Sequence, residues 1–173
     1  APRGPVVAGN DAKRPAVAAR LLGENPTLHG DDPYLACAIG DEAALRRATT
    51  RDPAWVNKVG GPLRLPPLVA VTHSGLASRP GFRERLRDCA RFLLVAGASP
   101  NQSIGNRWPP ASLEAPSGAE RLSALYGAAG KAFDPELTQL LLDAGADPND
   151  GESLYHSLEA PACTKLLLEA GAR

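Results

Sequence analysis

The chain's 173 residues are 43% hydrophobic and 22% charged, a composition typical of folded proteins and unlike that of disordered ones. Its 19 basic and 19 acidic residues give a formal net charge of zero, which excludes an overall field that would draw nucleic acid or an anionic membrane to the surface. Aromatic residues make up only 5%, so the core has to be built from leucine, alanine and valine, as in proteins made of thin helical layers.

The first residues of the chain, 1–13, are punctuated by proline and glycine and lack hydrophobic periodicity, so we expect an extended N-terminal arm. A short helix is predicted from Pro15 to just before Pro26. A second is predicted from Glu42 to Arg51, where Asp52 and the proline after it end the helix. We interpret both as outer helices of a repeating helical unit.

The segment 136–149 shows this unit most clearly. Its apolar side chains recur at the spacing of one helical stripe, a glycine follows the stripe as a left-handed cap, and Pro148 prevents the helix from continuing. The same pattern occurs twice more in register, which is typical of a stacked repeat protein. The stripe positions and the capping glycine are Leu137, Leu140, Leu141, Ala144 and Gly145 in this copy, Cys89, Phe92, Leu93, Ala96 and Gly97 in an earlier one, and Cys163, Leu166, Leu167, Ala170 and Gly171 in the last.

Each outer helix needs a partner helix before it, and short apolar segments at 33–40, 68–75, 125–129 and 154–158 fit that role. When these segments are aligned, every tyrosine of the chain falls on one position, although tyrosine was not used to choose the alignment. These residues are Tyr34, Tyr126 and Tyr155, with Val69 in the remaining copy.

The unit resembles the ankyrin repeat, a β-turn followed by two antiparallel helices with a period of about 33 residues. The resemblance is carried by Leu-Tyr-x-Ala-Ala around Tyr126, by the ending Gly-Ala-Asp-Pro-Asn at 145–149, and by Pro67 with Leu68 at the family's Pro-Leu pair. It implies an all-α fold. The expected architecture is a short, ankyrin-like helical solenoid of paired antiparallel helices over residues 14–173, with about four to five repeats and an open-ended last one.

Two insertions lengthen loops relative to the family's pattern, one within a helix pair at 75–85 and one between pairs at 104–120. In stacked repeats, insertions map to loops on one face, often the binding face. The second insertion contains Arg107 and Trp108, residue types that dominate binding energy at interfaces, so we expect it to overhang one edge and present both. Alternatively, Trp108 packs under its own loop as a small satellite core.

No dinucleotide-binding, P-loop, zinc-protease or nucleophile-elbow motif is present, so we expect neither catalysis nor a cofactor. The cysteines Cys37, Cys89 and Cys163 form no zinc-type pair, and two of them share a repeat position with a leucine. We therefore predict that all three are reduced, buried in the core and free of metal. The histidines are far apart in sequence, although His73 and His156 lie at nearby repeat positions and could face one groove.

The resemblance to ankyrin proteins implies a non-catalytic module that binds another protein through its concave face and the 104–120 loop, with no nucleic acid or membrane as partner. Two alternatives stay open: an enzyme or small-ligand-binding domain whose pocket is formed by the 75–85 and 104–120 insertions, and a regulatory fragment of a longer protein. The residues expected to contact a partner are Leu35, Ile39, Ala70, His73, Ser74, Arg107, Trp108, His156 and Glu159.

No apolar run approaches the roughly 18 residues of a membrane span, and no basic and then hydrophobic leader is present. The chain contains no methionine, so we expect that Met was removed, that a leader was cleaved, or that the chain is a piece of something longer. A cytoplasmic location is expected, with a secreted or periplasmic one after leader removal as the alternative.

Overall fold

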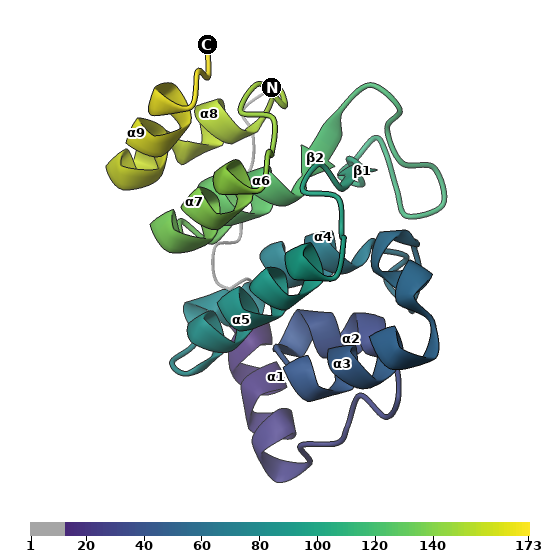
Figure 1. Ribbon diagram of the computed structural model, residues 1–173. Helices are drawn as coiled ribbons and strands as arrows, with labels where there is room; N and C mark the ends of the chain where they lie inside the picture. The colour runs from purple at the N-terminus through teal and green to yellow at the C-terminus, as the bar shows by residue number, and fades with distance from the viewer. Residues whose placement is uncertain (1–12) are drawn as a thin grey trace.

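The structure, a computed structural model, describes residues 13–173 and is mostly helical (Figure 1). The expected N-terminal arm lies outside the described residues, except for Lys13, which begins the first helix. The α-helices are α1 (Lys13–Glu24), α2 (Pro33–Ile39), α3 (Glu42–Arg51), α4 (Pro67–Thr72), α5 (Phe82–Val95), α6 (Ala124–Tyr126), α7 (Pro135–Asp143), α8 (Ser153–His156) and α9 (Pro161–Glu169). Shorter helical turns are η1 (Pro53–Asn57), η2 (Gly75–Ser78), the π-helical η3 (Gly127–Lys131) and η4 (Ser157–Glu159), and the strands are β1 (Ser103–Gly105) and β2 (Arg121–Ser123).

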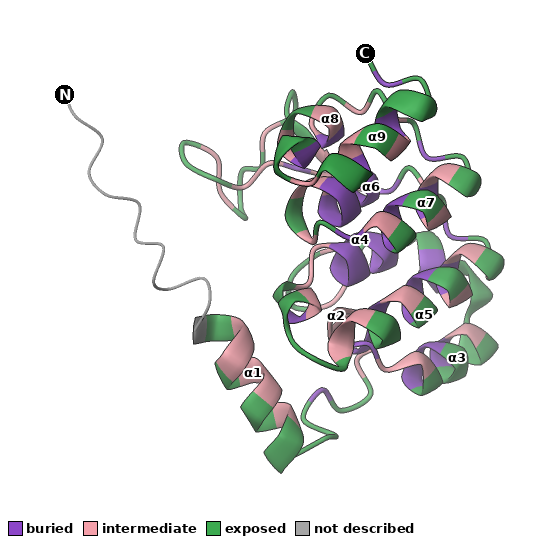
Figure 2. Cartoon of the chain, turned by 90° about the vertical axis from the view of Figure 1, so that its left-hand side faces the viewer, coloured by how far each residue is buried: buried purple, intermediate pink, exposed green. Residues whose placement is uncertain are grey.

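The helices from α2 to α9 form consecutive pairs that stack side by side in two rows, as Figure 1 and Figure 2 show from two directions. The inner row contains α2, α4, α6 with η3, and α8 with η4, and each member contacts the next. The outer row contains α3, α5, α7 and α9, which contact one another in the same order. Apart from one short hairpin, the described residues hold no sheet, so the predicted all-α class is confirmed.

Helix α1 does not join the outer row, contrary to the sequence prediction. It contacts η2, in the loop between α4 and α5, and Figure 2 shows it apart from α3. Its half-buried residues are Pro15, Ala16, Ala18, Ala19 and Leu22, while Val17 and Leu21 are exposed. A half-buried face of mostly small side chains buries little apolar area, so α1 lies on the surface of the stack.

The core lies between the two rows and is built mainly from leucine, alanine and valine, as the composition predicts. The first and third stripe positions are buried in each copy, including Cys89 and Cys163 at the position of Leu137, so the predicted burial of the cysteines is confirmed. The second and fourth stripe positions are half-buried or exposed. Cys37 is buried as well, and burial raises the pKa of all three thiols, that of Cys89 to about 12.

The repeated outer helices end as their glycines predict. Gly97, Gly145 and Gly171 adopt φ angles of 92°, 92° and 97°, a left-handed conformation that glycine accepts without strain. In each copy the backbone amide of the alanine after the glycine donates a hydrogen bond of 2.9 Å to the carbonyl of a leucine in the last turn of the helix. This bonding is that of a Schellman cap, and it satisfies carbonyl groups that the helix end would otherwise leave without partners.

Three asparagines connect the turn after one helix pair to the end of the outer helix in the next pair. Asn57, Asn101 and Asn149 lie in the turns that follow the helix pairs. Each side-chain amide donates to the carbonyl of the capping glycine of the next pair. Each side-chain oxygen accepts from the backbone amide of the residue two positions after that glycine. The distances are 2.8 and 2.8 Å for Asn57 with Gly97 and Ser99, 3.2 and 2.8 Å for Asn101 with Gly145 and Asp147, and 3.2 and 3.0 Å for Asn149 with Gly171 and Arg173.

A buried glutamine adds a connection between neighbouring pairs at the inner row. Helix α4 begins after Pro66, which has no side chain that can cap the free amides of the first turn. The side-chain oxygen of Gln102 accepts from the amide of Leu68 at 2.8 Å, and its nitrogen donates to the carbonyl of Val56 at 2.7 Å. The turn that follows the α4–α5 pair therefore caps the inner helix of that pair and bonds to the turn before it.

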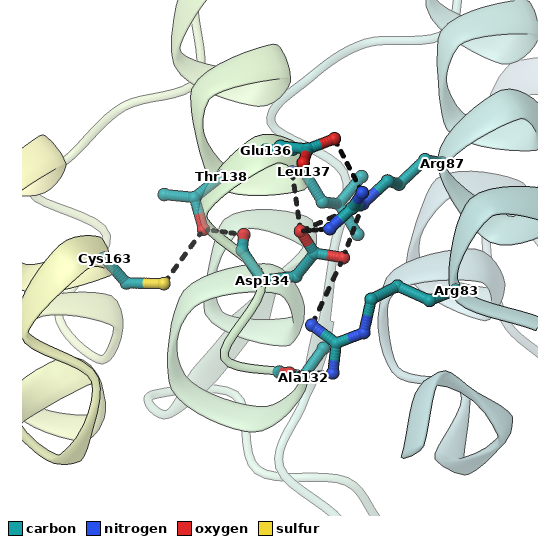
Figure 3. Close-up of polar contacts among 8 residues, drawn as sticks. All are labelled: Arg83, Arg87, Ala132, Asp134, Glu136, Leu137, Thr138 and Cys163. Carbon is teal, nitrogen blue, oxygen red and sulfur yellow. Dashed lines mark hydrogen bonds and ion pairs between the residues drawn. The ribbon is translucent and has the colours of Figure 1, made fainter. Parts of the chain in front are cut away.

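A buried carboxylate connects the outer helices α5 and α7 (Figure 3). Asp134 is 1% exposed and caps α7 by accepting from the amide of Leu137 at 3.1 Å. The guanidinium of Arg87 donates to both of its oxygens at 2.8–3.1 Å and to Glu136 at 2.6 Å. Such a bidentate pair fixes relative orientation as well as distance, so it also sets the register between the two helices.

The predicted insertions take different forms. The 75–85 insertion contains η2 and leads into α5, which begins at Phe82. The 104–120 insertion extends a hairpin in which β1 and β2 pair antiparallel, with Ile104 opposite Leu122. Across the described part of the chain, every helix is too short or too polar to cross a lipid bilayer.

The asparagine bridges predict a stability effect. Replacing Asn101 with alanine removes one donor and one acceptor contact between helix pairs, and we expect the free energy of unfolding to fall by about 1–2 kcal/mol. Urea denaturation followed by circular dichroism measures this change. Asn25→Ala is the control, because the Asn25 side chain bonds only to Thr27 in its own turn. Equal losses in the two variants would contradict a special role for the bridge.

Candidate binding groove

Both insertions line one groove of about 640 Å³ beside the inner row. The 75–85 insertion contributes η2 and Arg83, and the 104–120 insertion contributes Trp108. The remaining walls come from the start of α1, at Arg14 and Pro15, and from Lys131 at the end of η3 with Ala132 and Phe133 after it. The fold thus brings together segments that are distant in sequence and that the sequence analysis could not place relative to one another.

The indole of Trp108 stands on the groove wall and is 72% exposed. This exposure does not fit the alternative in which it packs beneath its own loop. The base of the loop is held by Asn106, whose amide donates to the carbonyl of Glu120 at 2.8 Å and whose side-chain oxygen accepts from the amide of Trp108 at 3.0 Å. The backbone that carries the indole is therefore fixed while the ring itself faces solvent.

Arg107 has a structural task that the sequence did not indicate. Its two terminal nitrogens donate at 2.7 Å to the carbonyls of Leu63 and Arg64, in the turn that precedes α4. Burial lowers the pKa of Arg107, with a further contribution from the nearby charge of Arg64. The expectation that Arg107 is presented to a partner is corrected here, because its guanidinium ties the 104–120 loop to the neighbouring turn.

Phe133 forms the other aromatic wall of the groove, and the sequence analysis missed it. Its φ of 50° lies in the left-handed region, which is uncommon for an aromatic residue and costs roughly 1 kcal/mol. The residue directly precedes Asp134, the cap of α7, and its ring is 39% exposed. The only sequence signal was the Asp-Pro pair that starts α7, which places Phe133 in a loop but does not direct its ring.

The two histidines expected in one groove instead flank Tyr126 in the inner row. The ring of Tyr126 lies 5.5 Å from that of His73 and 5.1 Å from that of His156, both edge to face. Close approach depends on glycines: an added Cβ would lie 2.4 Å from His73 at Gly127 and 2.5 Å from His156 at Gly130. The rings therefore pack neighbouring helix pairs together.

His73 also bonds to the backbone, because its Nε2 lies 2.8 Å from the carbonyl of Ser123. The hydroxyl of Ser123 donates to Asp150 and accepts from the amide of Tyr126. Histidine, serine and aspartate thus lie near one another. The histidine nevertheless engages the carbonyl rather than the hydroxyl, so the arrangement is not that of an activated nucleophile.

The other candidate residues have separate places. Ala70 is 3% exposed, and with Leu35 it lies under the turn around Gly60, so Ala70 offers a partner almost no surface. Ser74 lines the groove, but its hydroxyl donates to the carbonyl of Ala38 at 2.6 Å. Ile39 is half-buried at the end of α2. His156 contacts Glu152 at 3.2 Å on α8, and Glu159 is exposed in η4.

Within residues 13–173, no cluster of histidine, cysteine, aspartate and glutamate has the arrangement of a metal site. Comparisons with protein-family models, with curated proteins and with solved structures found no match to this chain. A functional proposal therefore has to rest on the geometry of the chain itself.

The glycine contacts predict a packing effect. Gly127→Ala places a methyl group against the His73 ring and the backbone of Thr72, at 2.4 and 2.9 Å, so we expect a destabilisation of about 1–3 kcal/mol from overpacking. Gly23→Ala in α1 is the matched control, because no atom lies within 4 Å of the added methyl group. There the higher helix propensity of alanine should stabilise by up to about 1 kcal/mol. Chemical denaturation of both variants tests the prediction, and stabilisation of both would contradict it.

The histidine contacts predict a pH effect. Burial lowers the pKa of His73 to about 4, the Ser123 carbonyl opposes the shift, and the charges of Lys131 and Arg107 add to it. Between this value and the ordinary pKa of 6.5, the unfolded chain binds more protons than the folded one, so stability should decrease as the pH falls through this window. The loss amounts to at most about 3 kcal/mol.

Unfolding midpoints of the wild type and of His73→Gln at pH 7 and pH 5 measure this effect. The wild type should lose more stability between the two values than the variant does, because glutamine does not titrate. Equal losses would show that the imidazole is as free to take up a proton in the folded state as in the unfolded one.

Proposed function

We propose that this chain is a non-catalytic protein-binding module of the ankyrin-repeat type, which holds a segment of a partner protein in the groove beside Trp108. The observation that carries the proposal is the exposed indole on the wall of a groove to which both insertions contribute. Tryptophan is usually well buried, and at protein interfaces it is among the residues that contribute most binding energy.

The stacked architecture supports the proposal in a second way. Each helix pair packs on its neighbours in the stack, and the asparagines and Asp134 satisfy polar groups between pairs. Such a stack gives an extended, rigid surface whose side chains need little reordering on binding. The ankyrin assignment rests on a repeated order of a turn, a short inner helix and a longer outer helix, which a left-handed glycine follows in the three units that end at Gly97, Gly145 and Gly171.

One observation favours the alternative of a small-ligand site. The groove volume lies within the roughly 300–1,000 Å³ of typical ligand pockets, and both insertions line it, as that alternative expects. We favour a protein partner because a small-molecule site usually encloses its ligand between apolar walls. Here one wall is a tryptophan ring that faces solvent and can extend a contact beyond the groove.

The proposal predicts separate effects of one substitution on binding and on stability. Partners captured from the native cell and identified by mass spectrometry supply the ligand for titration. Trp108→Ala should weaken binding of such a partner by about 2 kcal/mol or more. It should leave the melting temperature almost unchanged, because the indole buries little area in the free protein.

Trp55→Ala is the matched control, since this second tryptophan is buried and donates to Thr49 at 2.9 Å. That variant should lose about 3–5 kcal/mol of stability. If Trp108→Ala instead lowers the melting temperature by several degrees and spares affinity, the exposed tryptophan is structural and the proposed function is wrong at this site.

A further inference from the structure

We propose that the groove beside Trp108 selects a partner segment that carries acidic side chains next to an apolar one. This inference rests on the proposed function and specifies the chemistry of its ligand. It comes from the charges and rings that line the groove, which no sequence motif brought together.

The lining of the groove is basic. Arg14 comes from α1, Arg83 from the start of α5 and Lys131 from the end of η3, and no aspartate or glutamate is among the lining residues. The chain as a whole has a formal net charge of zero, so this is a local concentration of positive charge. A cleft lined by one sign of charge attracts ligands of the opposite sign.

The nearest buried carboxylate is already occupied. Asp134 lies behind the groove wall, and Arg87 holds both of its oxygens in a bidentate contact (Figure 3). Arg83 is further away, with its nitrogen 3.7 Å from Asp134, and it also donates to the carbonyl of Ala132 at 3.3 Å. Because Arg87 provides the closer counter-charge, the positive charge of Arg83 is only partly compensated from within the protein.

The effect of one lining cation, Lys131, extends beneath the groove. Burial is the main cause of the lowered pKa of His73, and the charges of Lys131 and of Arg107, which lies outside the groove lining, add to it. His73 packs against Gly127, in the same inner-row segment as Lys131. A neighbouring cation disfavours the protonated imidazole, so this contribution agrees with a positive potential at the groove.

The aromatic residues on the groove walls indicate that the bound segment also carries an apolar side chain. Trp108 and Phe133 both line the groove, and Phe133 is held there in a strained left-handed conformation. Strain of this kind persists where the surrounding structure fixes it, often at binding sites. Exposed rings beside cations fit an apolar side chain flanked by carboxylates. Nucleic acid fits less well, because its affinity depends on a longer row of phosphate contacts than three cations provide.

Selection of a random-peptide display library on the immobilised 173-residue chain tests the inference. We expect enrichment of peptides that combine aspartate or glutamate with a large apolar residue. A selected peptide, labelled with fluorescein, should bind more weakly as the ionic strength rises. Arg14→Gln and Lys131→Gln should each weaken its binding by roughly tenfold.

Arg20→Gln is the matched control, because Arg20 lies on the same helix as Arg14, is exposed and pairs with Glu24 outside the groove. Its affinity for the peptide should stay within about twofold of the wild type. Phe133→Asn tests the ring, since asparagine tolerates the left-handed conformation, so affinity should fall while the melting temperature is kept. Melting temperatures of all variants exclude misfolding as the cause.

The outcomes separate the two proposals. Selected peptides that lack acidic residues but still require Trp108 would overturn the charge inference and leave the protein-binding function standing. A failure to select any peptide, or equal binding to Trp108→Ala, would count against both. Displacement of the peptide by a single-stranded oligonucleotide of higher affinity would show that the cations serve phosphates, and the inference would be wrong.

Discussion

The asparagine side chains between helix pairs solve two physical problems with one residue. The carbonyl of the capping glycine lies beyond the helix end and needs a partner of its own, and the chain must then turn at a defined distance from the next pair. In each bridge the side-chain amide of the asparagine donates to the carbonyl of the capping glycine. Its side-chain oxygen accepts from the backbone amide two residues after that glycine. This geometry requires both the left-handed glycine and a fixed spacing between the turns, and the placement of the leucine stripes within the core follows from that spacing.

Inside the stack, the close contacts between helix pairs depend on two glycines in the inner row and on one buried carboxylate in the outer row. Gly127 and Gly130 allow His73 and His156 to approach η3 closely, one on each side. Neither glycine has a side chain at the point of contact. On the outer row, Asp134 both starts α7 and receives Arg87 from α5. Helix position and helix beginning are therefore coupled, and a shift of either would leave a buried charge without its partner, a costly change in a low-dielectric interior.

The sequence predicted the features that local periodicity controls. The helix from Glu42 to Arg51 has the predicted ends, and the capping glycines and the buried cysteines follow from the repeated stripe. Features that depend on contacts between distant segments were not predictable. The pattern around Pro15 indicated a helix, but the packing of that helix on η2 is a contact between distant segments.

The candidate site shows the same limit. Arg107 was chosen as an interface residue type, but its partners are carbonyl groups more than forty positions earlier in the chain. Phe133 and Lys131 carried no motif, and only the path of the chain through η3 and α7 brings them beside Trp108. Asn101 and Asn149 follow the helix endings in the sequence, but their reach to the next helix pair depends on the stacking geometry.

The residues that line the groove and the residues that hold the stack together are largely different sets. The asparagine bridges, the capping glycines and Arg87 lie outside the groove wall, whereas Arg14, Trp108 and Lys131 belong to segments at its rim. Substitutions at the rim can therefore accumulate without eroding the fold, so related chains under selection for different partners can diverge there while the frame stays constant. In this respect the 104–120 loop can tolerate sequence change at its exposed residues, because Arg107 keeps it attached to the turn before α4.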